Sequence, residues 1–441
     1  MPDSLITEAA PQIPARMSHL HWGGLGRALK HRNYRLFFGG QSISLIGTWL
    51  TRIATSWLVY KLSGSAWLLG VVSFVGQIPT FLLAPLAGVW VDRWDKHRVL
   101  LATQALAMAQ SAMLAVLALS GHIVPWHILA LSVFQGCINA FDTPARQTLL
   151  VEMVEMRSEV ANAIALNSSM ANATRLIGPS FAGILIALVG EGWCFAIDAL
   201  SYVAVLGSLA AMQVQARAPR LHRPVSHDLR EGWDYVWRFT TIRHILLLLA
   251  LVSLMGVPYT VLMPVLATHV YKGGPNTLGF LMAATGLGAL GGALYLAARR
   301  SVLGLGQVIV GATAAFGFGL MGLGVCRHEH LALPLMVLTG GSMIVQMAAS
   351  NIVLQTLADE DKRGRLMSFH TMAYFGMAPF GSLCAGALAD RLGAPLTIAL
   401  GGAACVLGAT AFGLKLPEMR LQVRPIYARL GILPTDGPAD P

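Results

Sequence analysis

A short charged segment between two apolar stretches is the first place in this sequence where chemistry could occur. It runs from Gly88 to Leu100, and six of the seven residues at positions 92–98 are charged or titratable. The residues of this segment that could form ion pairs at a gate are the carboxylate Asp92 and the cations Arg93, Lys96 and Arg98. A carboxylate and a cation that are partly shielded from water can form a pair that breaks and re-forms with a gate. The alternative interpretation is that the cluster only sets the orientation of the chain in a membrane.

Charged residues also stand inside the apolar stretches, where they are costly. Arg52, Arg175 and Asp198 fall well within such stretches. A charge at the centre of a membrane costs at least about 2.5 kcal/mol, so each side chain should face water, a partner or a substrate. We expect Arg52 to pair with Asp198 and Arg175 to meet an anionic group of a substrate. The alternative is that both arginines only bond to backbone carbonyls of neighbouring helices.

Asp142, at the end of a further apolar stretch, has two expected roles. It lies at the depth of the charged segment, so Arg93 or Lys96 is its expected partner. Asp142 and Asp198 are also the carboxylates nearest the membrane interior, which makes them the candidates for carrying a proton.

Amide side chains recur within the apolar stretches. A lining of neutral hydrogen-bonding groups would suit a bulky polar substrate, although many such amides bond only across helices. The candidates for the substrate or ion pathway are Gln41, Gln135, Asn139 and Asn167. The five cysteines are scattered without a CxxC pair, and His328-Glu329-His330 is expected to be a solvated loop. No cofactor, metal site or enzymatic motif is predicted.

The elements that must position these residues are membrane helices. The chain has 441 residues, 55% of them hydrophobic and only 12% charged, with a mean hydropathy of +0.62. Soluble domains carry about 25% charged residues, so lipid is the expected solvent. Hydropathy predicts twelve spans in an all-α membrane protein. They cover about residues 36–59, 66–91, 99–119, 127–142, 161–189, 193–212, 244–269, 277–298, 306–326, 332–356, 366–389 and 395–414.

The distribution of basic residues sets the expected topology. Of 31 lysines and arginines, 25 fall in segments on the side of the N-terminus and four on the opposite side. Both termini should therefore be cytoplasmic. Because the net charge of +10 is spread over all these loops, nucleic acid is not an expected partner. The predicted organisation is a tail 1–35, a six-helix bundle 36–212, a central loop 213–243 containing an amphipathic helix, a second bundle 244–414 and a tail 415–441.

The charged segment resembles a known family signature. Gly88-x-x-x-Asp92-Arg93-x-x-Lys96-x-Arg98 is similar to the loop 2–3 motif of the major facilitator superfamily, with Asp95 where the family has glycine. The segments 47–65 and 162–167, with Phe141-Asp142-Thr143-Pro144-Ala145-Arg146, resemble the transmembrane secretion effectors, the branch typified by the enterobactin exporter. Gly178-Pro179-x-x-x-Gly183 is similar to the helix 5 antiporter motif, without its leading glycines.

The resemblance implies a secondary transporter and not an enzyme. It implies two six-helix bundles that rock about a midplane site, with Asp92, Asp142 and Arg146 at a cytoplasmic gate. We expect a monomeric, proton-driven exporter of a small organic molecule, such as a siderophore or a drug, in the bacterial inner membrane. A lysophospholipid-type flippase is the rival within the class. A membrane scaffold or sensor without transport is the rival outside it.

Overall fold

The computed structural model describes residues 27–154, 157–213, 237, 239–299, 301–359, 362–430 and 432, and it is helical throughout these ranges apart from short connections. Several expected features lie outside the described residues: most of the N-terminal tail, the last part of the C-terminal tail, nearly all of the amphipathic helix of the central loop, and the side chain of Asp92.

The first group of helices covers the N-terminal half of the chain. Its members are α1 (Arg32–Ser63), α2 (Ala66–Arg93), α3 (Lys96–Leu119), α4 (Pro125–Glu152), α5 (Arg157–Val189) and α6 (Glu191–Ala210). Turns between them use residues suited to sharp reversals. Gly64, for example, closes α1 in the left-handed region (φ 63°), and Ser65 then caps α2 by accepting from the Leu68 amide.

The second group contains two interrupted helices. The first comprises α8 (Thr240–Leu251), turns at Val252–Gly256 and Val257–Thr260, α9 (Met263–Val265) and a turn at Leu266–Val270. The second comprises α13 (Arg363–Thr371), a π-turn at Met372–Gly376 and α14 (Ala378–Leu392). Prolines accompany both interruptions, because a proline cannot donate the helical hydrogen bond. The continuous helices are α10 (Pro275–Ala298), α11 (Leu305–Val325), α12 (Glu329–Leu357) and α15 (Ala394–Arg429).

Two helices run further than hydropathy predicts. α4 continues from the expected end at 142 to Glu152, through Pro144. α15 continues from 414 to Arg429, because Met419 and Val423 keep helical spacing and are buried against the second group. Ten of the described helical segments are long and apolar enough to cross a membrane. α1 and α4 are of similar length but are not among the ten.

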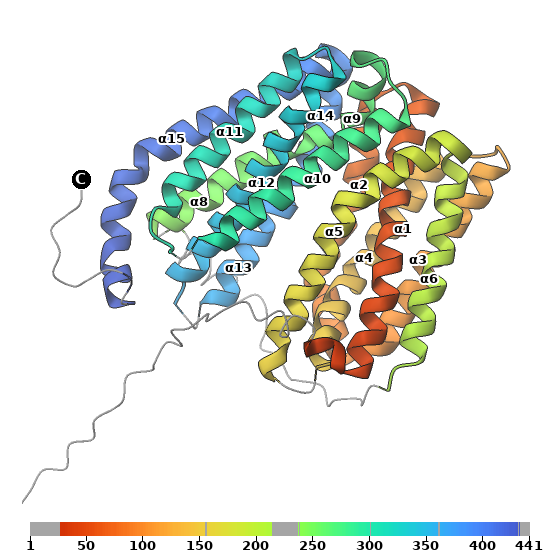
Figure 1. Ribbon diagram of the computed structural model, residues 1–441, viewed down its shortest axis with the longest axis horizontal. Coiled ribbons are helices and arrows are strands. Elements are labelled where there is room, and N and C mark those ends of the chain that lie inside the picture. Colours follow the sequence, from red (N-terminus) through yellow and green to blue (C-terminus); the bar gives the residue numbers. More distant parts are fainter. Residues whose placement is uncertain are drawn as a thin grey trace, which may run out of the picture.

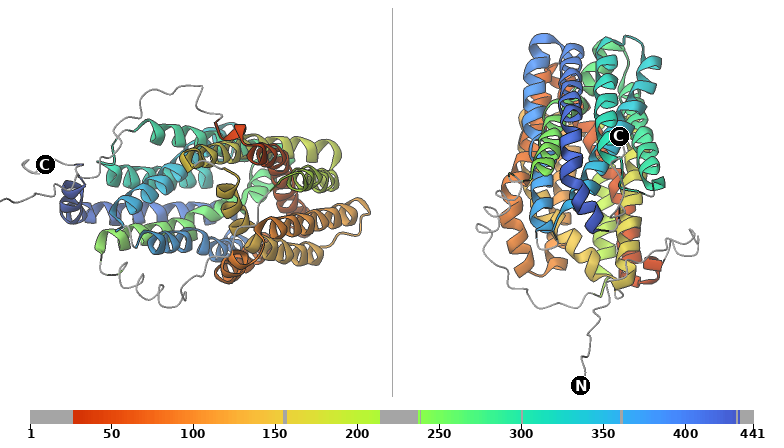
Figure 2. Two further views of the ribbon diagram at one scale, coloured as in Figure 1. Left: turned by 90° about the horizontal axis from the view of Figure 1, so that it is seen from below. Right: turned by 90° about the vertical axis from the view of Figure 1, so that its left-hand side faces the viewer.

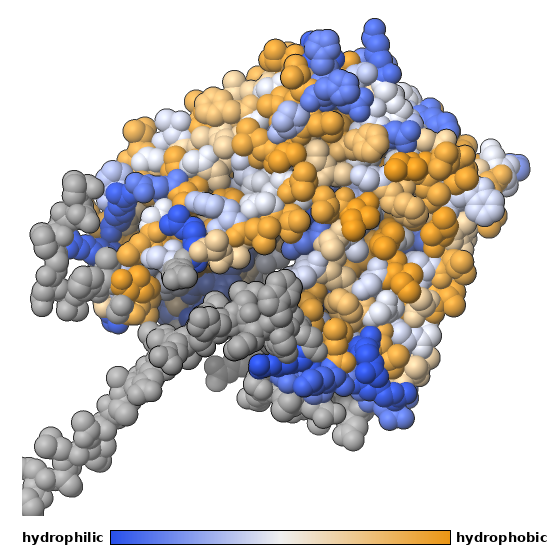
Figure 3. All heavy atoms as spheres, in the orientation of Figure 1, coloured by the Kyte–Doolittle hydropathy of each residue, from blue (hydrophilic) through white to orange (hydrophobic). Residues whose placement is uncertain are grey.

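The two groups stand side by side and diverge toward one end (Figures 1 and 2). We call the end where α2 begins and α14 terminates the closed end, and the end where α2 terminates and α3, α5 and α13 begin the open end. At the closed end, one buried apolar cluster contains residues of both groups. Toward the open end, each group has its own cluster. The molecule is hollowed between the groups there, and hydrophilic residues line the hollow (Figure 3). We refer to this hollow as the cleft.

Candidate functional site: the cleft and its two ends

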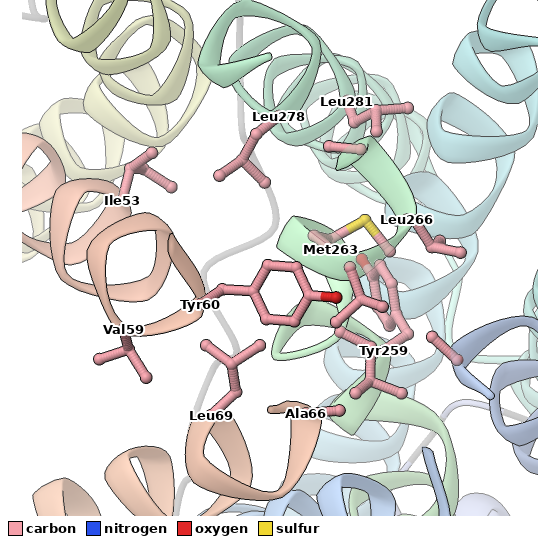
Figure 4. Close-up of a cluster of buried hydrophobic side chains, with 14 of the residues drawn as sticks. Ile53, Val59, Tyr60, Ala66, Leu69, Tyr259, Met263, Leu266, Leu278 and Leu281 are labelled. Carbon is pink, nitrogen blue, oxygen red and sulfur yellow. The ribbon is translucent and has the colours of Figure 1, made fainter. Parts of the chain in front are cut away.

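An apolar plug seals the closed end. Figure 4 shows the Tyr60 ring of α1 directed across the interface toward Met263 and Tyr259 of the second group. The edge of the Tyr60 ring also meets His269, with ring centroids 5.8 Å apart. Contacts of this kind are held by burial of apolar surface and not by directional bonds.

Glycines let helix backbones touch at the closed end. A Cβ atom on Gly183 of α5 would lie 2.6 Å from the Pro275 oxygen and 2.9 Å from the Gly279 Cα of α10. On the same helix, Gly178 packs against the Trp49 side chain of α1, where a Cβ would come within 2.6 Å. The helix 5 motif therefore packs α5 against α1 of its own group and against α10 of the second group. Small residues give membrane helices this close approach.

A carboxylate of the second group caps a helix of the first. Asp390, near the end of α14, accepts hydrogen bonds from the backbone amides of Ala66 (2.9 Å) and Trp67 (3.2 Å) at the start of α2. Nearby, a Cβ on Gly386 would lie 3.0 Å from the Gly70 Cα. Sequence reasoning missed Asp390. The signal that could have found it is Gly386-x-x-x-Asp390-Arg391, which repeats the Gly-x-x-x-Asp-Arg of residues 88–93.

At the open end, Asp95 separates α2 from α3. It is the N-cap of α3, and its carboxylate accepts from the amides of His97 (3.0 Å) and Arg98 (3.3 Å). This gives a structural reason for the departure from the family pattern, because a helix N-cap favours Asp. Arg93 and Arg98 are exposed, and Lys96 forms an ion pair with Glu152 of α4 (2.7 Å).

Asp142 is paired within its own helix, which corrects the expected pairing with Arg93 or Lys96. Arg146, one turn further along α4, donates to it through Nε (3.1 Å) and a terminal nitrogen. Thr103 and Gln104 of α3 donate to its other oxygen, at 3.0 and 2.6 Å. The expectation was wrong because α4 does not end at 142, so that Arg146 reaches Asp142 at the i, i+4 spacing.

Asp198, on α6, is buried against α1 and α3. It does not form the ion pair with Arg52 that the sequence predicts. Its Oδ2 accepts from Thr51 and Ser111, both at 2.7 Å. Its Oδ1 is buried without a hydrogen-bond partner in the described part of the chain. A Cβ on Gly47 would lie 2.5 Å from this oxygen, so the glycine leaves room for it. The carboxylate is thus held by hydroxyl groups, an arrangement that either protonation state can use.

The remaining candidates divide between the cleft and the helix packing. Arg52 is exposed, and its guanidinium lies over the Trp49 ring (5.3 Å to the centroid). Arg175 is half-buried on α5. Among the amides, Gln135 donates to Asn139 on the same helix (3.0 Å), Gln41 is buried and Asn167 is half-buried. Within the described ranges, no group of three His, Cys, Asp or Glu side chains could hold a metal ion.

This arrangement, a cleft between two helix groups that is sealed at one end, defines a transporter of the major facilitator type. A family model for transmembrane secretion effectors matches residues 27–426, and the chain belongs to that family. Its members and relatives are transporters and not enzymes.

Relatives with named functions match over most of their length. The chain is 27% identical to the staphyloferrin A transporter of Staphylococcus aureus, over 83% of this chain and 92% of that protein. It is 26% identical to the multidrug efflux pump Tap of Mycolicibacterium fortuitum, over 86% and 95% of the two chains. It is 21% identical to macrolide efflux protein A of Streptococcus pyogenes, over 82% and 92%.

Solved structures show the same fold at low identity. The nucleoside transporter NupG matches with a TM-score of 0.66 at 14% identity, over 88% of this chain and 99% of that one. A bacterial homologue of the lysosomal transporter Spinster, in an inward-facing and unoccupied conformation, matches with a TM-score of 0.64 at 14% identity, over 93% and 99%.

Proposed function

We propose that the protein is a proton-driven exporter of a small organic molecule that works by alternating access. In this proposal it spans the bacterial inner membrane twelve times as a monomer of two six-helix bundles, and both termini are cytoplasmic. The observation that carries the proposal is the cleft. Within the described residues, the two groups share a buried apolar cluster at the closed end, whereas each group has its own cluster toward the open end. With cytoplasmic termini, the structure is the inward-facing state, ready to accept a substrate from the cell.

The relatives support the direction of transport and the kind of cargo. Two of them are named as efflux proteins for drugs or macrolides, and one as a siderophore transporter. Charged residues inside the membrane are functional-site candidates by default, and here Arg52 and Arg175 belong to α1 and α5, two helices of the first group.

Proton coupling is assigned to Asp142 and Asp198, two of the buried carboxylates of the described residues. Asp198 is held only by hydroxyl groups and has one oxygen without a partner in the described chain, so it can gain a proton without breaking an ion pair. Asp142 must release Arg146 before it can do so. Asp198 is therefore the first candidate for the transported proton, and Asp142 is the candidate for a gate that responds to it.

Purified protein in proteoliposomes with an imposed pH gradient tests the proposal. Siderophores, macrolides and lysophospholipids are offered in turn, and a pH-sensitive dye follows proton movement. We expect one of the first two classes to move with protons, and Asp198→Asn to abolish the coupling. Glu418→Gln is the control, because this exposed residue is paired with Lys415 on the same helix. Lysophospholipid movement alone would instead support a flippase, and no movement of any class would contradict transport.

A further inference from the structure

Two arginines of the first group have no anionic partner among the residues that the structure describes. Neither Arg52 on α1 nor Arg175 on α5 forms a hydrogen bond or ion pair with a residue that the structure describes. Two like charges in a membrane protein with no counter-charge are expensive, so a binding partner of opposite charge is the natural complement.

The packing of α1 on α5 fixes how far apart the two arginines stand. The Tyr34 hydroxyl donates to the Ala163 oxygen, Ser42 contacts Met170, and Gly178 meets Trp49. All three contacts join residues 128 or 129 positions apart, so the helices run parallel in a constant register. Arg52 is then about six residues beyond the level of Arg175, or about 9 Å along the helix axis. The Trp49 ring lies between the two levels.

The second group completes the surroundings of Arg175. Gly286 of α10 touches the backbone of Arg175, where a Cβ would lie 2.9 Å from its oxygen. Thr285, the residue before Gly286 on α10, lies next to the Tyr259 side chain, so this tyrosine is close to the contact between α10 and Arg175. The Tyr259 hydroxyl is buried beside the Thr285 hydroxyl, but within the described part of the chain it makes no hydrogen bond of good geometry. An unpaired buried hydroxyl costs free energy, and an anion beside Arg175 would give it an acceptor.

We propose that Arg52 and Arg175 bind a substrate that carries two anionic groups, and that the Tyr259 hydroxyl donates to the group held by Arg175. This rests on the proposed function and narrows its substrate to organic dianions. A singly charged anion leaves one guanidinium without a counter-charge, and a cation is repelled by both. Guanidinium groups bind carboxylate or phosphate oxygens through paired hydrogen bonds, so both chemistries fit the site.

Binding to the purified full-length protein tests the assignment without requiring transport. The probes are linear dicarboxylates from succinate to sebacate and monocarboxylates of the same lengths, and the readout is the ligand-induced rise in thermal unfolding temperature. We expect the longer dicarboxylates to bind, and Arg52→Gln and Arg175→Gln each to weaken them at least about tenfold. Arg327→Gln, in an exposed loop at the closed end, is the matched control and should bind as the unaltered protein does.

The outcomes separate the site from the proposed function. Equal binding of monocarboxylates, or binding that both arginine variants retain, overturns the dianion site. Failure of every dianion to bind does so as well. A short-chain phosphatidic acid is added as a further probe, and its arginine-dependent binding in place of the dicarboxylates would identify the dianion as a lipid phosphate. Dianion binding without proton-coupled flux would instead refute the exporter and leave the site standing.

A second observation concerns Asp390. The helices α2 and α14 pack on each other, and each carries Gly-x-x-x-Asp-Arg in its last turns, at residues 88–93 and 386–391. Because the two helices run in opposite directions across the membrane, the two copies of the motif lie at opposite ends of the molecule (Figure 1).

The copy at the closed end is engaged. Asp390 satisfies two of the free amides at the start of α2, and Ser65 satisfies the next one, that of Leu68, at 3.3 Å. A carboxylate at a helix N-terminus is favoured by the orphan amides and by the helix dipole. Separation of α2 from α14 would break both Asp390 bonds at once.

We infer that Asp390 is a latch that holds the closed end shut. Spin labels at Ser120 and His328, exposed positions at the closed ends of the two groups, report its opening in protein whose native cysteines are replaced. Asp390→Ala should raise the population of the long label distance about three- to tenfold, and Asp390→Asn should raise it less. Gly386→Leu is the wedge control that forces α14 from α2. If the wedge lengthens the distance and Asp390→Ala does not, the latch is wrong. If neither does, alternating access fails too.

Discussion

The closed and open ends of the molecule are held by different kinds of force. At the closed end the two helix groups share one apolar cluster, and helix backbones touch at paired glycines. At the open end, Lys96–Glu152 and Asp142–Arg146 each join residues of the same group. Burial of apolar surface is not directional, whereas an ion pair depends on geometry. The seal is therefore made mainly by packing, to which the Asp390 cap adds two hydrogen bonds, and the open end carries charges that can change partners.

This difference suggests how the transporter would change state. To open the closed end, apolar surface and the Asp390 cap must be exposed to solvent. The compensation has to come from new contacts at the open end, where the exposed Trp90 and Trp94 rings, stacked with Phe141, already offer apolar surface. The packing at the closed end and the contacts formed at the open end therefore act in opposite directions on one conformational equilibrium.

The largest effect is expected from filling the glycine contact at the closed end. Gly279→Leu places a side chain where even a Cβ would lie 2.8 Å from the Pro179 oxygen and 3.0 Å from the Gly183 Cα. Overpacking of this kind costs about 1–3 kcal/mol, which is enough to move a two-state equilibrium by tenfold or more. We expect the closed end to open and export to fall by about tenfold or more. The opening is measured by the accessibility of the cleft to a bulky labelling reagent added from each side of the membrane.

The matched control for this wedge lies on the same helix. Gly291 of α10 has nothing within 4 Å of the position of a Cβ, so Gly291→Leu adds the same side chain without a clash. It should leave both accessibility and export close to those of the unaltered protein. An equal loss in both variants would show that α10 tolerates no added volume, and the closed-end contact would then have no special role.

An intermediate effect is expected at the open end from Asp142. Asp142→Asn removes the charge that Arg146 needs, in a pair whose side chains are 9% and 25% exposed. Breaking a largely buried pair leaves an uncompensated charge, and for this partly exposed arginine we expect about 2 kcal/mol of lost stability. A double-mutant cycle with Arg146→Gln, read by thermal unfolding, should show strong coupling. The cycle of Asp142→Asn with Lys96→Gln should show little, and strong coupling there would restore the pairing that the sequence suggested.

The sequence predicts the position of helices better than the partners of their side chains. Hydropathy locates the spans because lipid demands about 20 apolar residues, and it cannot see where a helix continues into polar sequence, as α4 does from 142 to Glu152. Once that end is misplaced, Arg146 is read as a loop residue and Asp142 loses its true partner. Arg52 and Asp198 lie at a similar depth, but Asp198 meets Thr51 on one side of α1 whereas Arg52 lies over Trp49. Depth along the membrane does not predict the side of a helix on which a residue stands.

The smallest effect is expected at Asp95, which stands where the superfamily motif has glycine and which is the N-cap of α3. Its carboxylate caps α3, so Asp95→Ala should cost about 1 kcal/mol, whereas Asp95→Gly should cost only a few tenths because glycine is itself a tolerated N-cap. Thermal unfolding of the two variants measures the difference. If glycine, the family's residue, is as harmful as alanine, the carboxylate does more than cap the helix. The segment between α2 and α3 would then depend on a charge at 95 that the superfamily motif does not contain.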